Sequence, residues 1–284
     1  MKVGFLGMGV MGLPMAKNLV KKAGCEILGF DVVEKQREAF AAAGGTAVSD
    51  AEEIYKTCDV IMQILPTHAI IRDSVEKAIR FGKPGRIIVD LSSTAPDIIQ
   101  EMYQDAKKAG MFLLDSPISG GNPMAIAGTL AIMTGGDKEA FEQVKPLLEC
   151  MGHPVYTGGA GSGSVTKLVN NIVAGAYMVV IAEAYAFAAK AGIDLQTTFE
   201  ATRGGFAGGP VYDNKVPKLI HRDYEPGARV AVHRKDILNA KHFAHHMGVD
   251  TPMNDNGHIN EDQIAMVKYY EDKMDVKVGN EDAQ

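Results

Sequence analysis

A glycine-rich turn close to the beginning of the chain constrains the fold more than any other feature of the sequence. A short apolar run at residues 3–6 leads into Gly-Met-Gly-Val-Met-Gly at residues 7–12. A segment of helical composition follows, and then a second apolar run at residues 27–30, directly before Asp31. This pattern is the fingerprint of a strand–helix–strand unit that binds a dinucleotide. An ordinary strand–helix turn is the alternative interpretation, since glycine-rich turns are common.

Each position of the turn has a physical reason in this fingerprint. Gly7 permits the sharp turn out of the strand, Gly9 lets the backbone approach a pyrophosphate, and Gly12 lets the helix pack closely on the strand. Val10 and Met11 complete the turn at the helix start, where free N–H groups attract phosphates. We therefore expect these five residues to bind the cofactor.

The acidic residue after the second strand indicates which dinucleotide is bound. The carboxylate of Asp31 can accept hydrogen bonds from both ribose hydroxyls of the adenosine half. A carboxylate at this place would repel the 2′-phosphate of NADP. The sequence therefore predicts NAD as the cofactor.

Charge and composition exclude some classes of partner. The chain has 284 residues, of which 46% are hydrophobic and 23% are charged, with a net charge of −6. This composition is typical of a globular protein with room for two domains. We expect no nucleic-acid partner, because phosphate-backbone binding needs concentrated Lys and Arg. Small anionic substrates stay possible, because the charge within a cleft can differ from the net charge.

Apolar and helical segments alternate along the first part of the chain. This alternation predicts an α/β fold, a doubly wound, largely parallel sheet with helices on both faces. The expected strands after the first two are residues 60–65, 86–91, 111–114, 130–134 and 155–156, and the expected helices between them are residues 73–81, 96–110 and 137–150.

The second part of the chain has a different character. Residues 165–191 predict one long, largely buried helix, and later segments are helical with no strand between them, at residues 195–202, 210–221, 236–247 and 260–272. We therefore expect a Rossmann-type nucleotide-binding domain at residues 1–163 and an all-helical domain at residues 164–284.

Two further segments carry groups suited to chemistry. Ser119, Gly120 and Gly121 follow a predicted strand, where a hydroxyl and open backbone N–H groups could hold a carboxylate, although the glycines could equally serve only a turn. Lys167 and Asn171 lie four residues apart, on one face of the predicted long helix. A partly desolvated lysine can exchange a proton near neutral pH, whereas a solvated surface lysine is the commoner fate.

A charged segment, His-Arg-Lys-Asp at residues 233–236, stands at the expected start of a later helix. Lys235 could reach back to a cofactor, and Asp236 would suit a helix N-terminus; a charged surface is the alternative. The nearby histidines have no accompanying ligand pattern, so we expect no metal: His242, His245 and His246.

Taken together, these segments resemble the β-hydroxyacid dehydrogenase family, in particular its 3-hydroxyisobutyrate dehydrogenase-like members. The matching segments occur in the family's order: GFLGMGVMGLPMAKNL from Gly4, ILP at 64–66, DLSST at 90–94, DSPISGGNPMAIAGTLAIMTGG from Asp115, the lysine–asparagine run ending at Asn171, and KD at 235–236. The chain departs from the family in having only three residues between Pro252–Met253 and Gly257, where a longer helical stretch is usual.

The resemblance implies a role for each matching residue. Lys167 would be the general acid and base, Asn171 would orient the substrate, and Ser119, Gly120 and Gly121 would hold the substrate carboxylate. The NAD site would be lined by Leu65, Pro66 and Thr94, with Lys235 closing over it.

The implied activity is oxidation of the hydroxyl of a small 3-hydroxy acid to a semialdehyde or ketoacid. A reductase working in the opposite direction on a tartronate semialdehyde-like substrate is the first alternative. A non-catalytic dinucleotide-binding module is the second, and the presence of Lys167 argues against it.

The long helix also bears on assembly and location. Its apolar residues surround it, so a partner must cover part of it, and we expect a homodimer or homotetramer. Glu183 and Lys190 interrupt the apolar run, so we expect no membrane span. The three cysteines lack pairing motifs and the first strand begins at once, which favours the cytoplasm.

Overall fold

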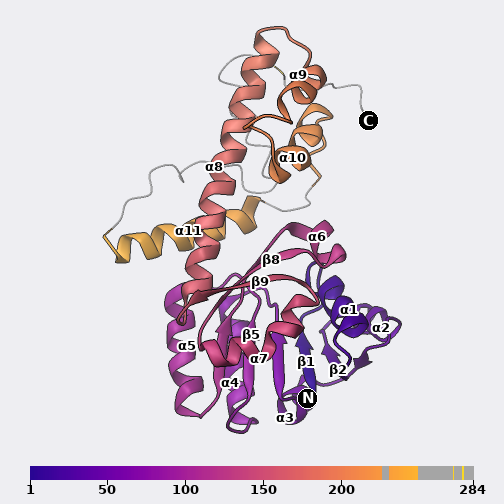
Figure 1. Cartoon of the computed structure of the whole chain (residues 1–284), viewed down its shortest axis with the longest axis vertical. Helices are drawn as coiled ribbons and strands as arrows, with labels where there is room; N and C mark the ends of the chain where they lie inside the picture. Colours follow the sequence, from indigo (N-terminus) through magenta and orange to yellow (C-terminus); the bar gives the residue numbers. More distant parts are fainter. Residues whose placement is uncertain (226–229, 249–270, 272–276, 278–284) are drawn as a thin grey trace. The chain divides into compact units, whose positions relative to one another are not determined.

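A nine-stranded sheet forms the frame of the first part of the chain (Figure 1). The structure, a computed structural model, describes residues 1–225, 230–248, 271 and 277. The chain forms two compact units, Met1–Lys167 and Leu168–Gln284. The sheet belongs to the first unit, and the two units are described separately below.

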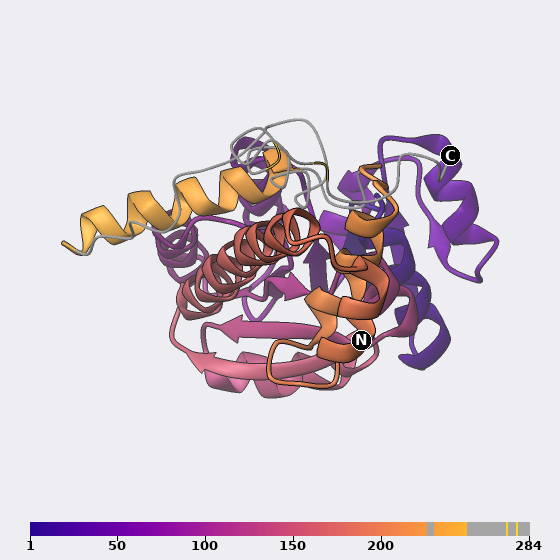
Figure 2. The same ribbon diagram turned by 90° about the horizontal axis from the view of Figure 1, so that it is seen from above.

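The strand order is that of a doubly wound fold. It runs β3-β2-β1-β4-β5-β6-β8-β7, with β9 paired to β8. Strands β1 to β6 are parallel, as predicted. Strand β8 runs antiparallel to β6 and β7. Strand β9 lies beside β8 and runs parallel to it (Figure 2). The strands are β1 Val3–Leu6, β2 Ile27–Phe30, β3 Thr46–Ala47, β4 Val60–Gln63, β5 Ile87–Asp90, β6 Phe112–Asp115, β7 Ile118–Ser119, β8 Leu130–Gly135 and β9 Gly152–Gly158.

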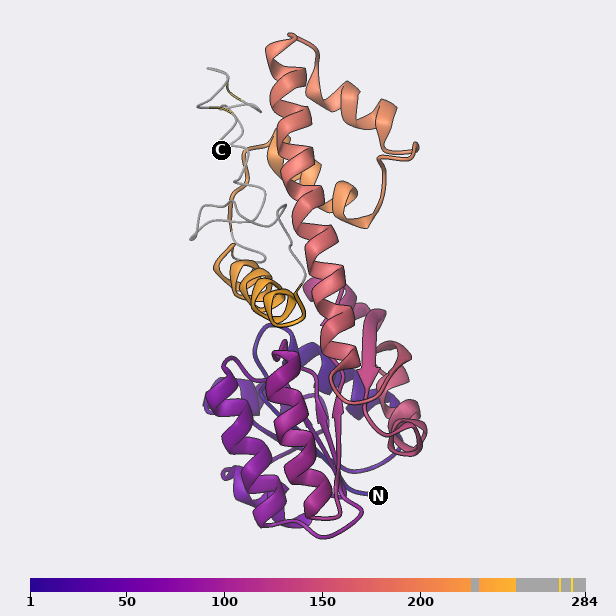
Figure 3. The same cartoon turned by 90° about the vertical axis from the view of Figure 1, so that its left-hand side faces the viewer.

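Helices cover both faces of this sheet (Figure 3). Alternate strand residues point into two separate cores. Val3, Met62 and Val89 belong to one core, and Ile61 and Ile88 belong to the other. Both faces of each central strand are therefore buried, which explains their continuous apolar runs. The helices of this unit are α1 Gly12–Lys22, α2 Glu34–Ala41, α3 Ala51–Thr57, α4 His68–Arg80, α5 Pro96–Lys108, α6 Gly121–Ala127 and α7 Lys138–Glu149.

The second unit contains helices throughout its described part, as predicted. The long helix α8 (Ser162–Lys190) begins in the first unit and continues into the second, followed by α9 (Leu195–Thr202), α10 (Pro210–Ile220) and α11 (Val230–His246). Side chains of α8, α9 and α10 form its core, among them Ile181, Phe199 and Val216. The helix expected at residues 260–272 and the short stretch after Pro252 lie outside the described residues, apart from residue 271.

Two expectations about the helices need correction. Within the single chain α8 is not largely buried: Tyr185 and Ala186 are buried, whereas Val173 and Phe187 are more than 60% exposed. α11 begins at Val230, so Asp236 lies inside the helix and is not its N-terminal residue. The charged residues at 233–236 indicated a helix start at that place. The residues directly before His233 are apolar, and they already belong to the helix.

The helix α8 also has the length and hydropathy of a membrane span. It is the one such helix among the described residues, and 33% of its most apolar 18-residue window is buried. Core helices meet the same criteria of length and composition. The expectation of no membrane association stays a prediction.

Candidate active site

The turn between β1 and α1 has the geometry that the glycine pattern predicts. Gly7 has φ +89°, and a Cβ atom there would lie 2.3 Å from the carbonyl oxygen of Ile64. A Cβ atom on Gly12 would lie 2.0 Å from the carbonyl oxygen of Gly7. A Cβ atom on Gly9, by contrast, would meet no atom within 4 Å. Gly7 and Gly12 are thus required by the protein's own packing, while the space beside Gly9 is open.

The start of α1 is suited to an anion. No side chain caps the helix at Met11, and its first turn contains no acidic residue. The helix start therefore presents its partial positive charge without an internal carboxylate to neutralise it. An empty space beside Gly9 and an uncapped helix start fit the pyrophosphate of a dinucleotide.

Asp31 stands directly beside this turn. Its Oδ2 accepts a hydrogen bond from the Met8 amide at 2.6 Å, and its Oδ1 accepts one from the Val33 amide at 2.8 Å. The Arg37 guanidinium donates to the Asp31 carbonyl at 2.6 Å, which places a cation near the end of β2. Sequence reasoning missed Arg37.

A buried aspartate organises the two loops at the ends of β4 and β5. Asp90 is fully buried and accepts hydrogen bonds from the Thr94 hydroxyl at 2.6 Å and the Ser92 amide at 3.2 Å. The Ser92 hydroxyl accepts from the Leu65 amide at 2.9 Å. Burial raises the pKa of the Asp90 carboxyl above its usual value. Leu65, which precedes Pro66, and Thr94 thus belong to one hydrogen-bonded arrangement at the carboxyl edge of the sheet.

The loop that carries Ser119, Gly120 and Gly121 is tied to the dinucleotide turn. Gly120 and Gly121 both have positive φ, +137° and +68°, a conformation that favours glycine. In the short helix that follows, the Asn122 side chain donates to the Val10 carbonyl at 2.7 Å. Sequence reasoning missed Asn122, because its partner lies 112 residues away in the chain.

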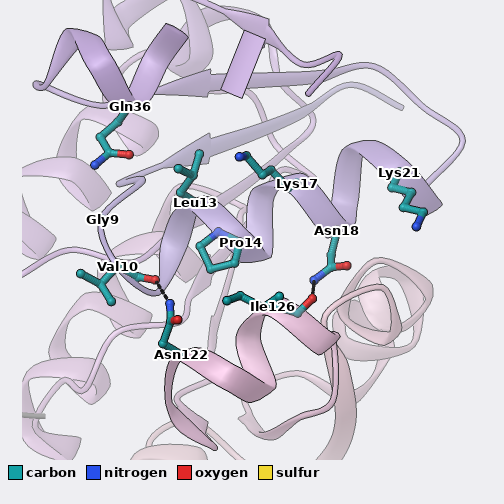
Figure 4. Close-up of a pocket in the computed structure, with 10 residues that line it drawn as sticks. All are labelled: Gly9, Val10, Leu13, Pro14, Lys17, Asn18, Lys21, Gln36, Asn122 and Ile126. Atoms are coloured by element: carbon teal, nitrogen blue, oxygen red, sulfur yellow. Dashed lines mark hydrogen bonds between the residues drawn. The ribbon is translucent and has the colours of Figure 1, made fainter. Parts of the chain in front are cut away.

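A groove of about 460 Å³ lies beside this connection (Figure 4). Asn122 points to Val10 on one side of it, and Asn18 of α1 donates to the Ala125 and Ile126 carbonyls on the other. The groove is lined by Gly9, Val10, Leu13, Pro14, Lys17, Asn18, Lys21, Gln36, Asn122 and Ile126. Gly9 and Val10 therefore contribute to both the groove and the dinucleotide turn.

Another buried aspartate holds the beginning of α8. Asp115, the last residue of β6, accepts hydrogen bonds from the Gly161 amide at 2.9 Å and the Ser164 amide at 2.7 Å. Burial raises the pKa of its carboxyl to about 6. Lys167 is half-buried and lies one helical turn beyond Ser164.

Asn171 and Lys235 meet a common residue in the second unit. The Asn171 amide donates to Asp236 at 2.8 Å, and the Asn170 amide donates to Asn171 Oδ1 at 3.0 Å. Lys235 Nζ lies 3.6 Å from Asp236 Oδ1. These contacts fix both ends of the Asn171 amide group.

A metal site is absent from the part of the chain that the structure describes. No group of three or more His, Cys, Asp or Glu side chains there could hold an ion. The expectation that the protein works without a metal stays a prediction.

Two sequence families match consecutive parts of the chain, and together they span almost its whole length. One, described as the NAD binding domain of 6-phosphogluconate dehydrogenase, matches residues 2–159. The other, described as the NAD-binding of NADP-dependent 3-hydroxyisobutyrate dehydrogenase, matches residues 161–270.

Individual relatives agree with these matches. The 2-hydroxy-3-oxopropionate reductase of Escherichia coli is 33% identical over 256 residues, which span 89% of this chain and 87% of that protein. The NAD-dependent L-serine dehydrogenase of Pseudomonas aeruginosa is 33% identical over 264 residues, which span 89% and 88%. The structure of Mycobacterium tuberculosis 3-hydroxyisobutyrate dehydrogenase with L-serine has a TM-score of 0.84 at 29% identity, and covers 94% of this chain and 98% of that one.

Proposed function

The chain belongs to the β-hydroxyacid dehydrogenase family, and on this premise we propose that Lys167 is the general acid and base of its reaction. As a member of this family, the protein is an NAD(P)-dependent oxidoreductase that acts on the CH–OH group of a hydroxy acid. The observation that supports Lys167 most is its position. It lies one turn into a helix that starts at the carboxyl edge of the sheet, and the dinucleotide turn lies at the same edge.

In the proposed reaction the two hydrogens of the substrate's CH–OH group leave separately, one as a hydride to the cofactor and one as a proton to the protein. NAD, when bound, accepts the hydride from the carbinol carbon. Lys167, in its neutral form, takes the proton from the hydroxyl oxygen, so a carbonyl forms and the product is a semialdehyde or ketoacid. In the opposite direction the Lys167 ammonium returns the proton to the carbonyl oxygen.

Other residues would bind and orient the reactants. Ser119, Gly120 and Gly121 would hold the substrate carboxylate through a hydroxyl and backbone amides. The positive φ angles at both glycines keep this loop in a conformation that side chains disfavour. Asn171 would orient the substrate, and its fixed amide group supports that role.

The dinucleotide turn would form the main part of the NAD site. Gly7, Gly9, Val10, Met11 and Gly12 would receive the pyrophosphate, and the open space beside Gly9 supports this. Further residues would line or close the site: Leu65, Pro66, Thr94 and Lys235.

We propose that NAD is preferred over NADP because the Asp31 carboxylate stands beside the dinucleotide turn. A carboxylate there favours ribose hydroxyls and repels a 2′-phosphate. The NAD-dependent L-serine dehydrogenase among the relatives supports this preference. Arg37 limits it, because its guanidinium lies against the Asp31 carbonyl and could attract a phosphate.

The second candidate function is reduction of a small semialdehyde. The relative named 2-hydroxy-3-oxopropionate reductase, at 33% identity over 89% of the chain, favours this direction. Both directions use the same residues, since Lys167 serves as the acid in one and the base in the other.

A substrate screen in both directions tests the proposal. We expect oxidation of at least one small 3-hydroxy acid, from a panel of 3-hydroxyisobutyrate, 3-hydroxypropionate, L-serine and 2-(hydroxymethyl)glutarate, with a higher kcat/KM for NAD than for NADP. In the reductive direction, tartronate semialdehyde with NADH is the probe. NAD binding without turnover of any of these compounds would indicate a non-catalytic module and would contradict the proposal.

We propose further that the protein is a homodimer or homotetramer that assembles through α8. Four apolar side chains at intervals of four and seven residues form one exposed stripe on this helix: Val169 57%, Val173 62%, Val180 54% and Phe187 68%. Apolar side chains at this spacing share one helix face, and exposed apolar stripes of this kind mark protein–protein contacts. Light scattering should give a mass of at least twice 30.4 kDa. Val173→Glu should lower that mass, and a wild-type monomer would contradict the assembly.

The remaining expectations are proposals as well. We place the domain limits at residues 1–163 and 164–284, which the family matches at 2–159 and 161–270 support. A cytoplasmic location stays a proposal, and fractionation of the source cells would test it.

A further inference from the structure

We infer that Asp115 is a positioning residue whose buried carboxylate fixes the first turn of α8 and thereby holds Lys167 in place for proton transfer. This inference rests on the proposed role of Lys167. It concerns residues of the first unit only, since Asp115, the start of α8 and Lys167 all belong to Met1–Lys167.

The contacts of Asp115 bracket the beginning of the helix. Its Oδ1 accepts from the Gly161 amide, just before α8, and its Oδ2 accepts from the Ser164 amide in the first turn. These amides belong to the group of N–H donors that a helix leaves unpaired at its start. Asp115 is 1% exposed, and its buried carboxylate thus joins the end of β6 to the start of α8.

The surroundings leave this carboxylate little freedom to move. A Cβ atom on Gly135 would lie 2.6 Å from Asp115 Oδ1, and one on Gly163 would lie 2.4 Å from the Asp115 carbonyl oxygen. The helix start is therefore seated directly against the ends of β6 and β8. Any displacement of Asp115 must be transmitted to the first turn of α8.

Lys167 lies close enough along the helix to follow such a displacement. It is three residues beyond Ser164, which corresponds to a rise of roughly 4.5 Å, or nearly one turn. Proton transfer demands close alignment, and a misplacement of about 1 Å can reduce a rate by about a hundredfold. The position of the Lys167 ammonium is consequently tied to the two hydrogen bonds of Asp115.

The aspartates that cap other helices of the protein differ from Asp115 in the number of amides they accept and in their exposure. Asp50 accepts one amide, that of Glu52 at the start of α3, and Asp194 accepts one amide, that of Thr197 at the start of α9. Both are exposed. Asp115 is buried, and burial raises its pKa to about 6, so its charge is held at a cost that the exposed caps avoid. Because this buried charge lies at the start of the helix that carries Lys167, its free-energy cost is consistent with a role in the active site.

Steady-state kinetics of a small set of variants tests the inference. Asp115→Asn keeps the shape and one carbonyl acceptor, and Asp115→Ala removes both. We expect kcat to fall about tenfold in Asp115→Asn and about a hundredfold in Asp115→Ala, with the NAD dissociation constant within about twofold of wild type. Asp50→Asn, the matched change at a remote cap of the same unit, should leave kcat and KM unchanged.

A solvent isotope effect separates positioning from a loss of folded protein. If Asp115 aligns Lys167, the proton-transfer step becomes slower in Asp115→Asn, and the deuterium solvent isotope effect on kcat rises above that of wild type and Asp50→Asn. Wild-type kcat in Asp115→Asn, or a lower kcat with an unchanged isotope effect, would overturn the inference. Should Lys167→Ala retain wild-type turnover, the proposed role of Lys167 fails; should Lys167→Ala be inactive while Asp115→Asn is normal, this inference alone fails.

Discussion

Two glycine-rich turns at the same edge of the sheet lead into helices, and the protein uses them in opposite ways. In the dinucleotide turn (residues 7–12), α1 starts with no side-chain cap and with open space beside Gly9. In the α8 turn (residues 158–164), the carboxylate of Asp115 accepts the amides of Gly161 and Ser164. One helix start is open and the other is closed.

The contrast between the two turns shows what decides whether a helix start can bind a ligand. Both turns have glycines and both present backbone amides, so composition does not distinguish them. An internal carboxylate satisfies the donors of the α8 turn and neutralises its partial charge. The open turn can receive an external anion, whereas the closed one can only hold its helix, and with it Lys167, in place.

The strongest loss of activity should follow from a change of Lys167, which lies on α8 just beyond the closed turn. Lys167→Ala should lower kcat by about 10²-fold to 10⁴-fold, the usual contribution of a general acid–base group. The NAD dissociation constant should stay near that of wild type, because the open turn is unchanged. Lys138→Ala, at an exposed position at the start of α7, serves as the control and should keep full activity. A near-normal kcat in Lys167→Ala would remove this residue from the mechanism.

The next effect concerns the stability of the closed turn. The Asp115 carboxyl has a pKa of about 6 in the fold against an ordinary value of 3.8. Between these pH values the folded state binds the proton and the unfolded state does not, so the free energy of unfolding falls as pH rises, by up to about 3 kcal/mol. Below the window the carboxyl is protonated in both states, and above it the carboxyl is ionised in both.

Denaturation of wild type and Asp115→Asn at pH 4 and pH 7 measures this effect. The difference between their free energies of unfolding should shift against the wild type as pH rises. Asp90, the neighbouring buried carboxyl, is present in both proteins, so its titration cancels in the comparison. A difference that does not change with pH would show that burial leaves the Asp115 carboxyl unperturbed.

The open turn was predictable from sequence because its determinants are local. The glycine spacing and the apolar runs gave β1 and β2 with the bounds that the structure has, Val3–Leu6 and Ile27–Phe30. The helix α9 was equally predictable, because an acidic cap and a compact apolar pattern define it. The expected residues of the dinucleotide turn all lie there, although their contacts with NAD stay a prediction.

The closed turn was not predictable, because its determinant is remote in sequence. Asp115 lies 46 residues before Gly161, and the short strand β7 and helix α6 that follow Asp115 have too few residues for a periodic pattern. Sequence reasoning assigned neither a strand nor a helix to that segment. Side chains that join distant elements, such as Asp115 and Asn122, become visible only when the strands are placed side by side.

A smaller effect is expected from the acidic residue beside the open turn. Asp31→Asn should reduce the ratio of kcat/KM with NAD to kcat/KM with NADP by roughly tenfold to a hundredfold, because repulsion of the 2′-phosphate is lost. Arg37→Ala, which removes the nearby cation, should change this ratio in the opposite direction. Equal or better use of NADP by the wild type would contradict the assigned role of Asp31.

Calorimetric titration of NAD into Gly9→Ala and Gly159→Ala tests the contrast between the two turns most directly. Both glycines have φ outside the left-handed region, and a Cβ atom on either would meet no protein atom within 4 Å, so both variants should fold normally. We predict that Gly9→Ala raises the NAD dissociation constant about tenfold, because the added methyl group occupies the space of the pyrophosphate, and that Gly159→Ala leaves it unchanged. Equal NAD affinity in the two variants would contradict the assignment of the pyrophosphate to the dinucleotide turn.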